Sequence, residues 1–217
     1  LEFRRVLFRS NCSATPRDMV DSQLFGHRRG AFTGAVDNFP GVIRAAASGT
    51  LFLDEIGDTP LDIQPKLLRF LESSEVHPIG ETHPQTVDVR VVAATNADLD
   101  VLVDQGRFRQ DLLYRLNVVK LHLPPLRERR AEIPALAEHY LQKGARESHK
   151  GHLRLAEETM EYLLLYRWPG NIRELANEMR RPAALAEPDA VLMPEHLSPS
   201  IAASRRDRKS TRLNSSH

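Results

Sequence analysis

Gly49-Thr50-Leu51-Phe52-Leu53-Asp54-Glu55 is the stretch that decides the fold. Its three consecutive apolar residues lie between a glycine and two carboxylates, and they predict a strand that is buried on both faces of a sheet. Ligands of open α/β sheets bind at the carboxyl ends of the strands, where Asp54 and Glu55 emerge. Adjacent carboxylates repel each other, so the pair indicates either a nearby cation or full solvation. A hydrated Mg²⁺ on a nucleotide phosphate meets the first condition, and a strand that ends at the surface meets the second.

Periodicity places this strand within an alternation of strands and helices. The stretch from Val87 to Asn96 alternates and then becomes wholly apolar, which predicts a second central strand ending in Thr95 and Asn96. The stretch from Val118 to Leu123 predicts the strand that closes the sheet. Helical spacing predicts helices at about 16–25, 61–71, 98–103 and 109–116. This pattern favours a mostly parallel, layered α/β domain.

The end of this domain is predicted in Pro124–Arg130, a stiff and charged stretch, so that the α/β core covers residues 11–126. Helical patterns at about 131–147, 156–166 and 171–185 predict a small helical domain over residues 127–200. Trp168-Pro169-Gly170 predicts the turn between its last two helices, with Trp168 packed in the core.

Composition limits the class of protein. A hydrophobic content of 41% over 217 residues suits one α/β domain and a smaller satellite. Cys12 is the only cysteine, so the chain forms no internal disulfide, and a reducing, cytoplasmic setting is favoured. No apolar run approaches the roughly 20 residues of a membrane helix. The first residues do not resemble a signal peptide, because charges interrupt them.

The two ends differ from the rest of the chain. Both resemble translated sequencing-adapter DNA, which predicts that residues 1–10 and about 207–217 are not native, and we expect residues 201–217 to be disordered. Basic residues are in excess at both ends, and the sequence between them is acidic. The basic tail is therefore not interpreted as a nucleic-acid-binding arm.

A second informative run is Gly30-Ala31-Phe32-Thr33-Gly34-Ala35. Its small residues permit a tight, mobile loop with Phe32 near the tip. The alternative is a surface turn whose Phe32 folds back into the core, which is the commoner fate of a phenylalanine.

These runs together resemble the central ATPase domain of the bacterial sigma-54-dependent transcription activators, a branch of the AAA+ superfamily. The most specific match is the unbroken GAFTGA run of Gly30–Ala35, followed by the Walker B strand Gly49–Glu55. The stretches Phe108–Asn117 and Trp168–Leu175 complete the resemblance, which extends from Asn11 to about Leu197. It implies an AAA+ layered parallel-sheet core, a small α-helical lid, ATP and Mg²⁺ as ligands, and a homo-oligomeric ring, expected to be a hexamer.

The resemblance also implies roles for residues at the strand ends. Asp54 would hold Mg²⁺ through water, and Glu55 would activate the hydrolytic water. Asn11 would hydrogen-bond Glu55. Thr95 and Asn96 would sense the γ-phosphate, although a strand-end cap explains Asn96 equally well.

Three arginines match positions that contact nucleotide in this family. Arg109 and Arg115 would reach the nucleotide of a neighbouring subunit, and Arg173 would contact the phosphate in its own subunit. An arginine that reaches the nucleotide of a neighbouring subunit is called an arginine finger. It can contribute on the order of 10³–10⁵ in rate, and it makes hydrolysis depend on assembly. Taken alone, Arg109 and Arg115 are more simply explained as helix-surface charge, for example paired with Asp111.

By the same resemblance, Phe32 and Thr33 at the tip of Gly30–Ala35 would contact sigma-54 in the RNA polymerase holoenzyme. The implied function is ATP-dependent remodelling of the closed promoter complex. Contact with DNA would require a C-terminal domain that is not in this sequence, since none follows Leu197.

The match has departures, and two alternatives remain. The sequence contains no glycine-rich phosphate loop with its Lys and Ser/Thr, so we expect the polypeptide as given to hydrolyse no ATP. Gln23 stands where the family usually has Glu. One alternative is a DNA-binding regulator with a helix-turn-helix at 156–185, although Glu174 and Glu178 oppose a basic groove-binding face. The other is a non-catalytic interaction protein that has kept the fold.

Overall fold

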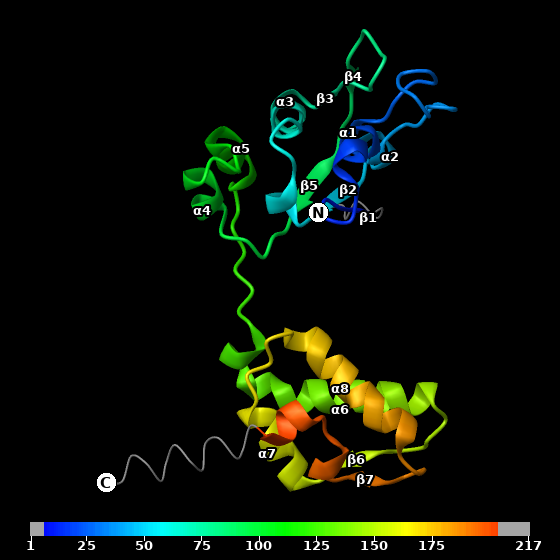
Figure 1. Cartoon of the computed structure of the whole chain (residues 1–217), viewed down its shortest axis with the longest axis vertical. Coiled ribbons are helices and arrows are strands. Elements are labelled where there is room, and N and C mark those ends of the chain that lie inside the picture. Colours follow the sequence, from blue (N-terminus) through cyan, green and yellow to red (C-terminus); the bar gives the residue numbers. More distant parts are fainter. Residues whose placement is uncertain (1–6, 204–217) are drawn as a thin grey trace. The chain divides into compact units, whose positions relative to one another are not determined.

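The computed structural model describes residues 7–203, without the side chains of Leu7 and Asp18. Two compact units are present, and the first ends at Leu121 while the second begins at His122 (Figure 1). The sequence predicted this boundary a few residues later, after residue 126. Leu126 is buried in the core of the second unit, which explains the difference.

The first unit is built on a three-stranded parallel sheet (Figure 1). Its strand order is β1 (Leu7–Asn11), β2 (Thr50–Asp54) and β5 (Arg90–Ala93). The central strand β2 buries Leu51 and Leu53 completely on one face, whereas Phe52 on the other face is only half-buried. The burial predicted for both faces is therefore seen in part. Asn11 lies opposite Asp54, and Leu53 lies opposite Ala93. The carboxyl ends of the three strands therefore meet at one edge, which we call the carboxyl edge.

Within residues 7–121, five α-helices accompany the sheet, and four of them lie within a few residues of their predicted positions. Their apolar faces, including Leu24, Leu67, Phe70 and Leu112, form one core with β2. The helices are α1 (Arg17–Phe25), α2 (Val42–Ala45), α3 (Gln64–Ser73), α4 (Leu99–Asp104) and α5 (Gln110–Leu116).

A short antiparallel hairpin, β3 (Glu75–Val76) and β4 (Gln85–Thr86), follows α3. Its turn is bonded to the residues that precede the GAFTGA run. The amide of Arg28 donates to the carbonyl of Ile79 at 2.9 Å, and the amide of Ile79 donates to the carbonyl of Gly26 at 2.9 Å. Strands of two residues are too short for a periodicity argument to detect.

The strand predicted at 118–123 is absent, and this prediction is wrong. Val118, Val119, Leu121 and Leu123 are all more than three quarters exposed. A strand exists only through pairing with a neighbour, and within residues 7–203 this segment pairs with none. It forms an extended connection after α5 instead.

The second unit is mainly helical, with a small parallel pair of strands that the sequence did not predict. Gly144 allows the two long helices to approach closely, because a Cβ at this position would lie 2.9 Å from the Cβ of Ala183. Its elements are η2 (Leu126–Glu128), η3 (Arg130–Glu132), α6 (Ile133–Glu147), β6 (Arg154–Leu155), α7 (Glu157–Leu165), α8 (Asn171–Leu185), β7 (Val191–Leu192) and η4 (Pro194–His196).

The ordered chain extends beyond the predicted limit of this unit. Ile201 is buried in its core, so the disorder predicted from residue 201 onward is wrong for this residue. Residues 1–6 and 204–217, which contain most of the two ends predicted to be non-native, lie outside the described residues. No helix within residues 7–203 is long and apolar enough to span a membrane.

Candidate active site

Glu55 follows β2 directly and adopts an unusual backbone conformation. Its φ of 54° and ψ of 49° lie in the left-handed region, which is sparsely populated by residues other than glycine and costs on the order of 1–3 kcal/mol. The Oε2 atom of Glu55 accepts a hydrogen bond from the amide of Asn96 at 3.3 Å. This contact joins the carboxyl ends of β2 and β5 through a carboxylate.

The segments that follow these two strands remain in register beyond the sheet. The amide of Ala94 donates to the carbonyl of Leu53 at 2.8 Å, and the amide of Ile56 donates to the carbonyl of Ala94 at 3.0 Å. The side chain of Thr95 accepts from the amide of Ala97 at 3.1 Å. It also lies against Gly57, where a Cβ would come within 3.0 Å of Thr95 Oγ1. Asp54, Glu55, Thr95 and Asn96 thus lie at the carboxyl ends of two neighbouring strands.

Asn11 ends β1 at the same edge, but its side chain does not make the expected contact with Glu55. Its Oδ1 atom accepts from the amide of Ser13 at 2.9 Å, from the hydroxyl of Ser13 at 2.7 Å and from the amide of Ala14 at 3.2 Å. Within the described chain, no hydrogen bond joins Asn11 to Glu55. Local capping of the turn after β1 competes for this oxygen, which is a common role of asparagine.

Asp54 has a cationic partner that the sequence did not predict. Arg9 Nη2 donates to Asp54 Oδ2 at 2.5 Å, and the Asp54 side chain is 17% exposed. The Arg9 guanidinium also lies 5.8 Å from the centre of the Phe52 ring, the residue opposite it in the ladder. Arg9 belongs to the stretch that we predicted to be non-native. Its contact becomes apparent only once the register between β1 and β2 is known.

Arg109 and Arg115 are both occupied within their own chain. Arg109 donates two hydrogen bonds to Asp111, of 3.0 and 2.6 Å, and these bonds are the main cause of the lowered pKa of Asp111. Arg115 donates through Nε and Nη2 to the carbonyl of Leu71, at 3.0 and 2.8 Å. The pair with Asp111 is the arrangement expected of helix-surface charge. A role toward another subunit stays a prediction.

Arg173 lies in the first turn of α8 within the helical unit, where its side chain is exposed. The start of this helix is fixed by its neighbours: Glu174 Oε2 accepts from the amide of Gly170 at 2.8 Å, and Asn171 Oδ1 accepts from the amide of Leu126 at 2.9 Å. Trp168 is fully buried, and its indole donates to the carbonyl of Leu163 at 2.8 Å, which confirms its predicted place in the core.

The GAFTGA run forms a compact loop whose phenylalanine is not in the core. The amide of Gly30 donates to the carbonyl of Ala35 at 2.8 Å and closes the loop. Gly30 and Gly34 have φ values of 79° and 104°, which other residues rarely adopt. Phe32 is 41% exposed, and the centre of its ring lies 5.0 Å from the centre of the His27 ring in an edge-to-face arrangement. The alternative in which Phe32 folds back into the core is therefore wrong.

Comparison with known proteins identifies the family. Residues 3–122 match the model of the sigma-54 interaction domain, and residues 127–214 match that of the AAA+ ATPase lid domain. The chain belongs to the sigma-54 interaction domain family. The lid match accounts for α7 and α8, so a DNA-binding helix-turn-helix at this place is not favoured.

Relatives and solved structures agree with this assignment. The chain is 49% identical over 182 residues to the DNA-binding transcriptional regulator NtrC of Klebsiella pneumoniae, covering 84% of this chain and 39% of NtrC. It is 47% identical over 188 residues to the alginate biosynthesis transcriptional regulatory protein AlgB of Pseudomonas putida, covering 87% of this chain and 42% of AlgB. Crystal structures of NtrX from Brucella abortus in complex with ADP and with ATP superpose with TM-scores of 0.83 and 0.84. Their identities are 30% and 29%, and they cover 90% and 92% of this chain and 43% and 44% of NtrX. The chain spans about two fifths of the length of these relatives.

In this sigma-54 interaction domain, a brace of side chains joins the segment just before the GAFTGA loop to the β3–β4 hairpin. Glu81 accepts from Arg28 Nε at 2.8 Å and from Gln85 Nε2 at 2.8 Å, and Arg44 Nη1 lies 4.0 Å from it. Burial of Glu81 by itself raises its pKa, but these hydrogen bonds and charges outweigh burial and lower the pKa. The sequence did not reveal this brace, because its partners are far apart in the chain.

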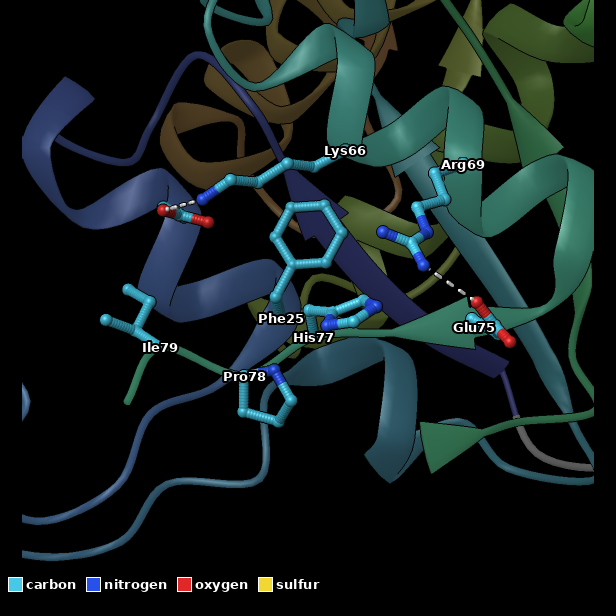
Figure 2. A pocket seen from close by; sticks show the side chains of 8 residues that line it. Phe25, Lys66, Arg69, Glu75, His77, Pro78 and Ile79 are labelled. Carbon is cyan, nitrogen blue, oxygen red and sulfur yellow. Dashed lines mark hydrogen bonds and ion pairs between the residues drawn. The ribbon is translucent and has the colours of Figure 1, made fainter. Parts of the chain in front are cut away.

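A pocket of about 310 Å³ lies elsewhere in the first unit, between α1, α3 and the hairpin. Figure 2 shows the Phe25 ring between the side chains of Lys66 and His77, with ion pairs from Lys66 to Asp21 and from Arg69 to Glu75. None of the residues predicted for the active site lines it. The pocket therefore does not mark the nucleotide site. Its lining residues are Asp21, Phe25, Lys66, Arg69, Glu75, His77, Pro78 and Ile79.

The carboxyl edge could hold a metal ion that is also bound by the phosphate oxygens of a ligand. No group of three or more His, Cys, Asp or Glu side chains capable of holding a metal occurs in the described part of the chain. Mg²⁺ keeps several waters and is usually held by one or two carboxylates together with phosphate oxygens. Asp54, at the end of a buried strand, fits this role once its ion pair with Arg9 opens.

Proposed function

We propose that this chain is the ATP-hydrolysing domain of a sigma-54-dependent transcription activator. Its hydrolysis cycle would move the Gly30–Ala35 loop against promoter-bound sigma-54 RNA polymerase. The observation that carries the proposal is the hydrogen bond from the Asn96 amide to Glu55, which unites the ends of β2 and β5 beside Asp54. The 217 residues contain no glycine-rich phosphate loop, so the activity is proposed for a longer polypeptide that includes one.

Each residue at the carboxyl edge has a chemical role in this proposal. Asp54 would hold Mg²⁺, which neutralises charge on the phosphate oxygens. Glu55 would orient the attacking water and accept its proton, and its fixed backbone limits the directions in which its carboxylate can point. The hydroxyl of Thr95 and the side-chain amide of Asn96 would donate to the terminal phosphate, while the backbone N–H of Asn96 holds Glu55.

The arginines would complete this site in an oligomer. Arg109 and Arg115 are exposed and held by contacts within their own subunit. A guanidinium on a firm support can donate to the phosphate oxygens of a neighbouring subunit with little loss of side-chain freedom. Arg173 would act on the nucleotide of its own subunit. This arrangement requires a homo-oligomeric ring, which we propose to be a hexamer.

In this proposal, the Gly30–Ala35 loop makes the contact with sigma-54. Phe32 is the only large apolar side chain of Gly30–Ala35, and it is exposed. Aromatic anchors often dominate small contact patches. We therefore assign the contact with sigma-54 to Phe32 and its neighbour Thr33, supported by the other residues of the loop.

Steady-state ATP hydrolysis tests the catalytic part of the proposal in a longer version that includes the phosphate loop. Glu55→Gln should lower kcat by about 10²-fold or more, the usual contribution of a general base, while ATP still binds. Glu72→Gln removes an exposed carboxylate from α3 and is the matched control. Hydrolysis that survives Glu55→Gln would show that Glu55 is a solvated strand-end residue.

A further inference from the structure

Gln64, in the first turn of α3, is a completely buried polar side chain. Its Nε2 donates to the carbonyl of Thr59 at 2.9 Å and to the carbonyl of Arg107 at 3.1 Å. Its Oε1 accepts from the amide of Arg109 at 2.8 Å. A buried amide that loses such partners leaves polar groups without hydrogen bonds, so this arrangement is costly to disturb.

The three partners admit only one orientation of the amide. Two of them are carbonyl oxygens that need donors, and the third is an N–H group that needs an acceptor. Glutamine has two donors and an acceptor on one planar group. Glutamate has the acceptor without the donors, and leucine has neither. Neither glutamate nor leucine can therefore reproduce the three hydrogen bonds of Gln64. We call these bonds to Thr59, Arg107 and Arg109 the Gln64 clip.

The clip joins two parts of the proposed catalytic machinery. Thr59 lies four residues after Glu55, at the end of the 3₁₀ turn that follows β2. Arg109 is the residue that caps the start of α5, and its own side chain makes no capping hydrogen bond. In a capping box, a Gln or Glu within the helix satisfies the amide of the capping residue. Here Gln64 provides that acceptor from a different helix.

We propose that Gln64 is a positioning residue that couples the segment after Glu55 to Arg109. Through it, the backbone that carries the catalytic edge and the backbone that presents the arginine move together. The effect on turnover rests on the proposed function, since it requires Arg109 to act on a neighbouring nucleotide. The clip itself does not rest on that function.

Amide hydrogen exchange in the 217-residue chain tests the clip without any activity. The Arg109 amide should be protected in the unmodified chain, and Gln64→Leu should speed its exchange about tenfold or more, provided that the variant stays folded. Gln64→Glu keeps the acceptor and should retain part of this protection. Gln110→Leu, the same change at an exposed neighbouring position, should leave the Arg109 amide unaffected. Rapid exchange of this amide in the unmodified chain would overturn the proposal even if every variant unfolds.

Turnover in mixed oligomers tests the coupling, in the longer version with the phosphate loop. Gln64→Glu should lower kcat about tenfold or more through misplacement of Arg109, with the KM for ATP within about twofold. Glu55→Ala subunits carry an intact Arg109, so mixing them in should partly restore turnover, as it should for Arg109→Ala. Rescue of Arg109→Ala without rescue of Gln64→Glu would overturn the coupling. If neither is rescued, the action of Arg109 across subunits is wrong, and the exchange result alone decides whether Gln64 positions it.

Discussion

Glu81 carries the negative charge of the brace between the hairpin and the segment just before the GAFTGA loop. Its folded pKa is lowered, mainly because the hydrogen bonds from Arg28 and Gln85 outweigh its burial. A carboxylate with a depressed folded pKa contributes stability above its unfolded pKa of about 4.3. That contribution is lost as the pH falls through the folded value.

We therefore expect the cost of Glu81→Gln to depend on pH. At pH 7 the substitution should lower the free energy of unfolding by about 1 kcal/mol or less, because Arg28 is 59% exposed and solvent screens the pair. The difference should shrink as the pH falls below about 4. Urea denaturation at several pH values measures both effects, with Glu72→Gln as the exposed control. A cost that stays constant between pH 7 and pH 3 would show that the charge of Glu81 is unimportant.

Single residues also show which parts of the site could be predicted from the sequence. Asp54, Glu55, Thr95 and Asn96 were predictable, because residues that follow two neighbouring parallel strands must meet at one edge. Gln64 was not, since nothing in a helical pattern distinguishes a buried glutamine from an exposed one. The resemblance suggested that Asn11 contacts Glu55, but the turn after β1 takes its side-chain oxygen.

At the scale of elements, we propose that the GAFTGA loop contacts sigma-54 while the carboxyl edge hydrolyses ATP. Phe32→Ala in the longer version should cost far less than the roughly 3–5 kcal/mol of truncating a buried phenylalanine, because Phe32 is 41% exposed. ATP hydrolysis should stay within a few fold, while binding of sigma-54 in the ATP transition state is lost.

Melting temperature, hydrolysis and sigma-54 capture, measured on one preparation of Phe32→Ala, distinguish the two roles of this residue. Val36→Ala is a suitable control, because Val36 is also exposed and lies just outside the loop. A Phe32→Ala protein that is destabilised and inactive in hydrolysis would assign Phe32 to the fold rather than to the contact.

The elements differ in how well periodicity predicts them. Strand β2 lies between two neighbouring strands and buries Leu51 and Leu53, so its continuous apolar run was informative. The stretch at 118–123 also carries four apolar residues, but composition cannot show whether a partner strand lies beside it. The two-residue strands of the hairpin and of the helical unit are set by tertiary contacts rather than by a local pattern.

At the scale of the whole molecule, the proposed site is incomplete in one subunit. In the longer version, Arg109→Ala and Arg115→Ala should abolish turnover and largely spare nucleotide binding, because a finger acts on the transition state. Mixing either variant with Glu55→Ala should restore part of the activity. The Glu55→Ala subunit supplies the intact arginine, and the arginine variant supplies the intact Glu55. Absence of rescue at every mixing ratio would favour a role within one subunit or simple surface charge. Arg107→Ala, one turn before α5, is the control for loss of an exposed arginine.

Open-complex formation on a sigma-54-dependent promoter tests the central claim most directly. The longer version should convert closed complexes to open ones with ATP, and should fail to do so with a non-hydrolysable analogue. Glu55→Gln should bind ATP and give no open complexes, because its carboxylate is needed for hydrolysis. Open complexes formed equally well by Glu55→Gln, or none formed by a version that hydrolyses ATP, would contradict the claim that hydrolysis at the carboxyl edge drives activation.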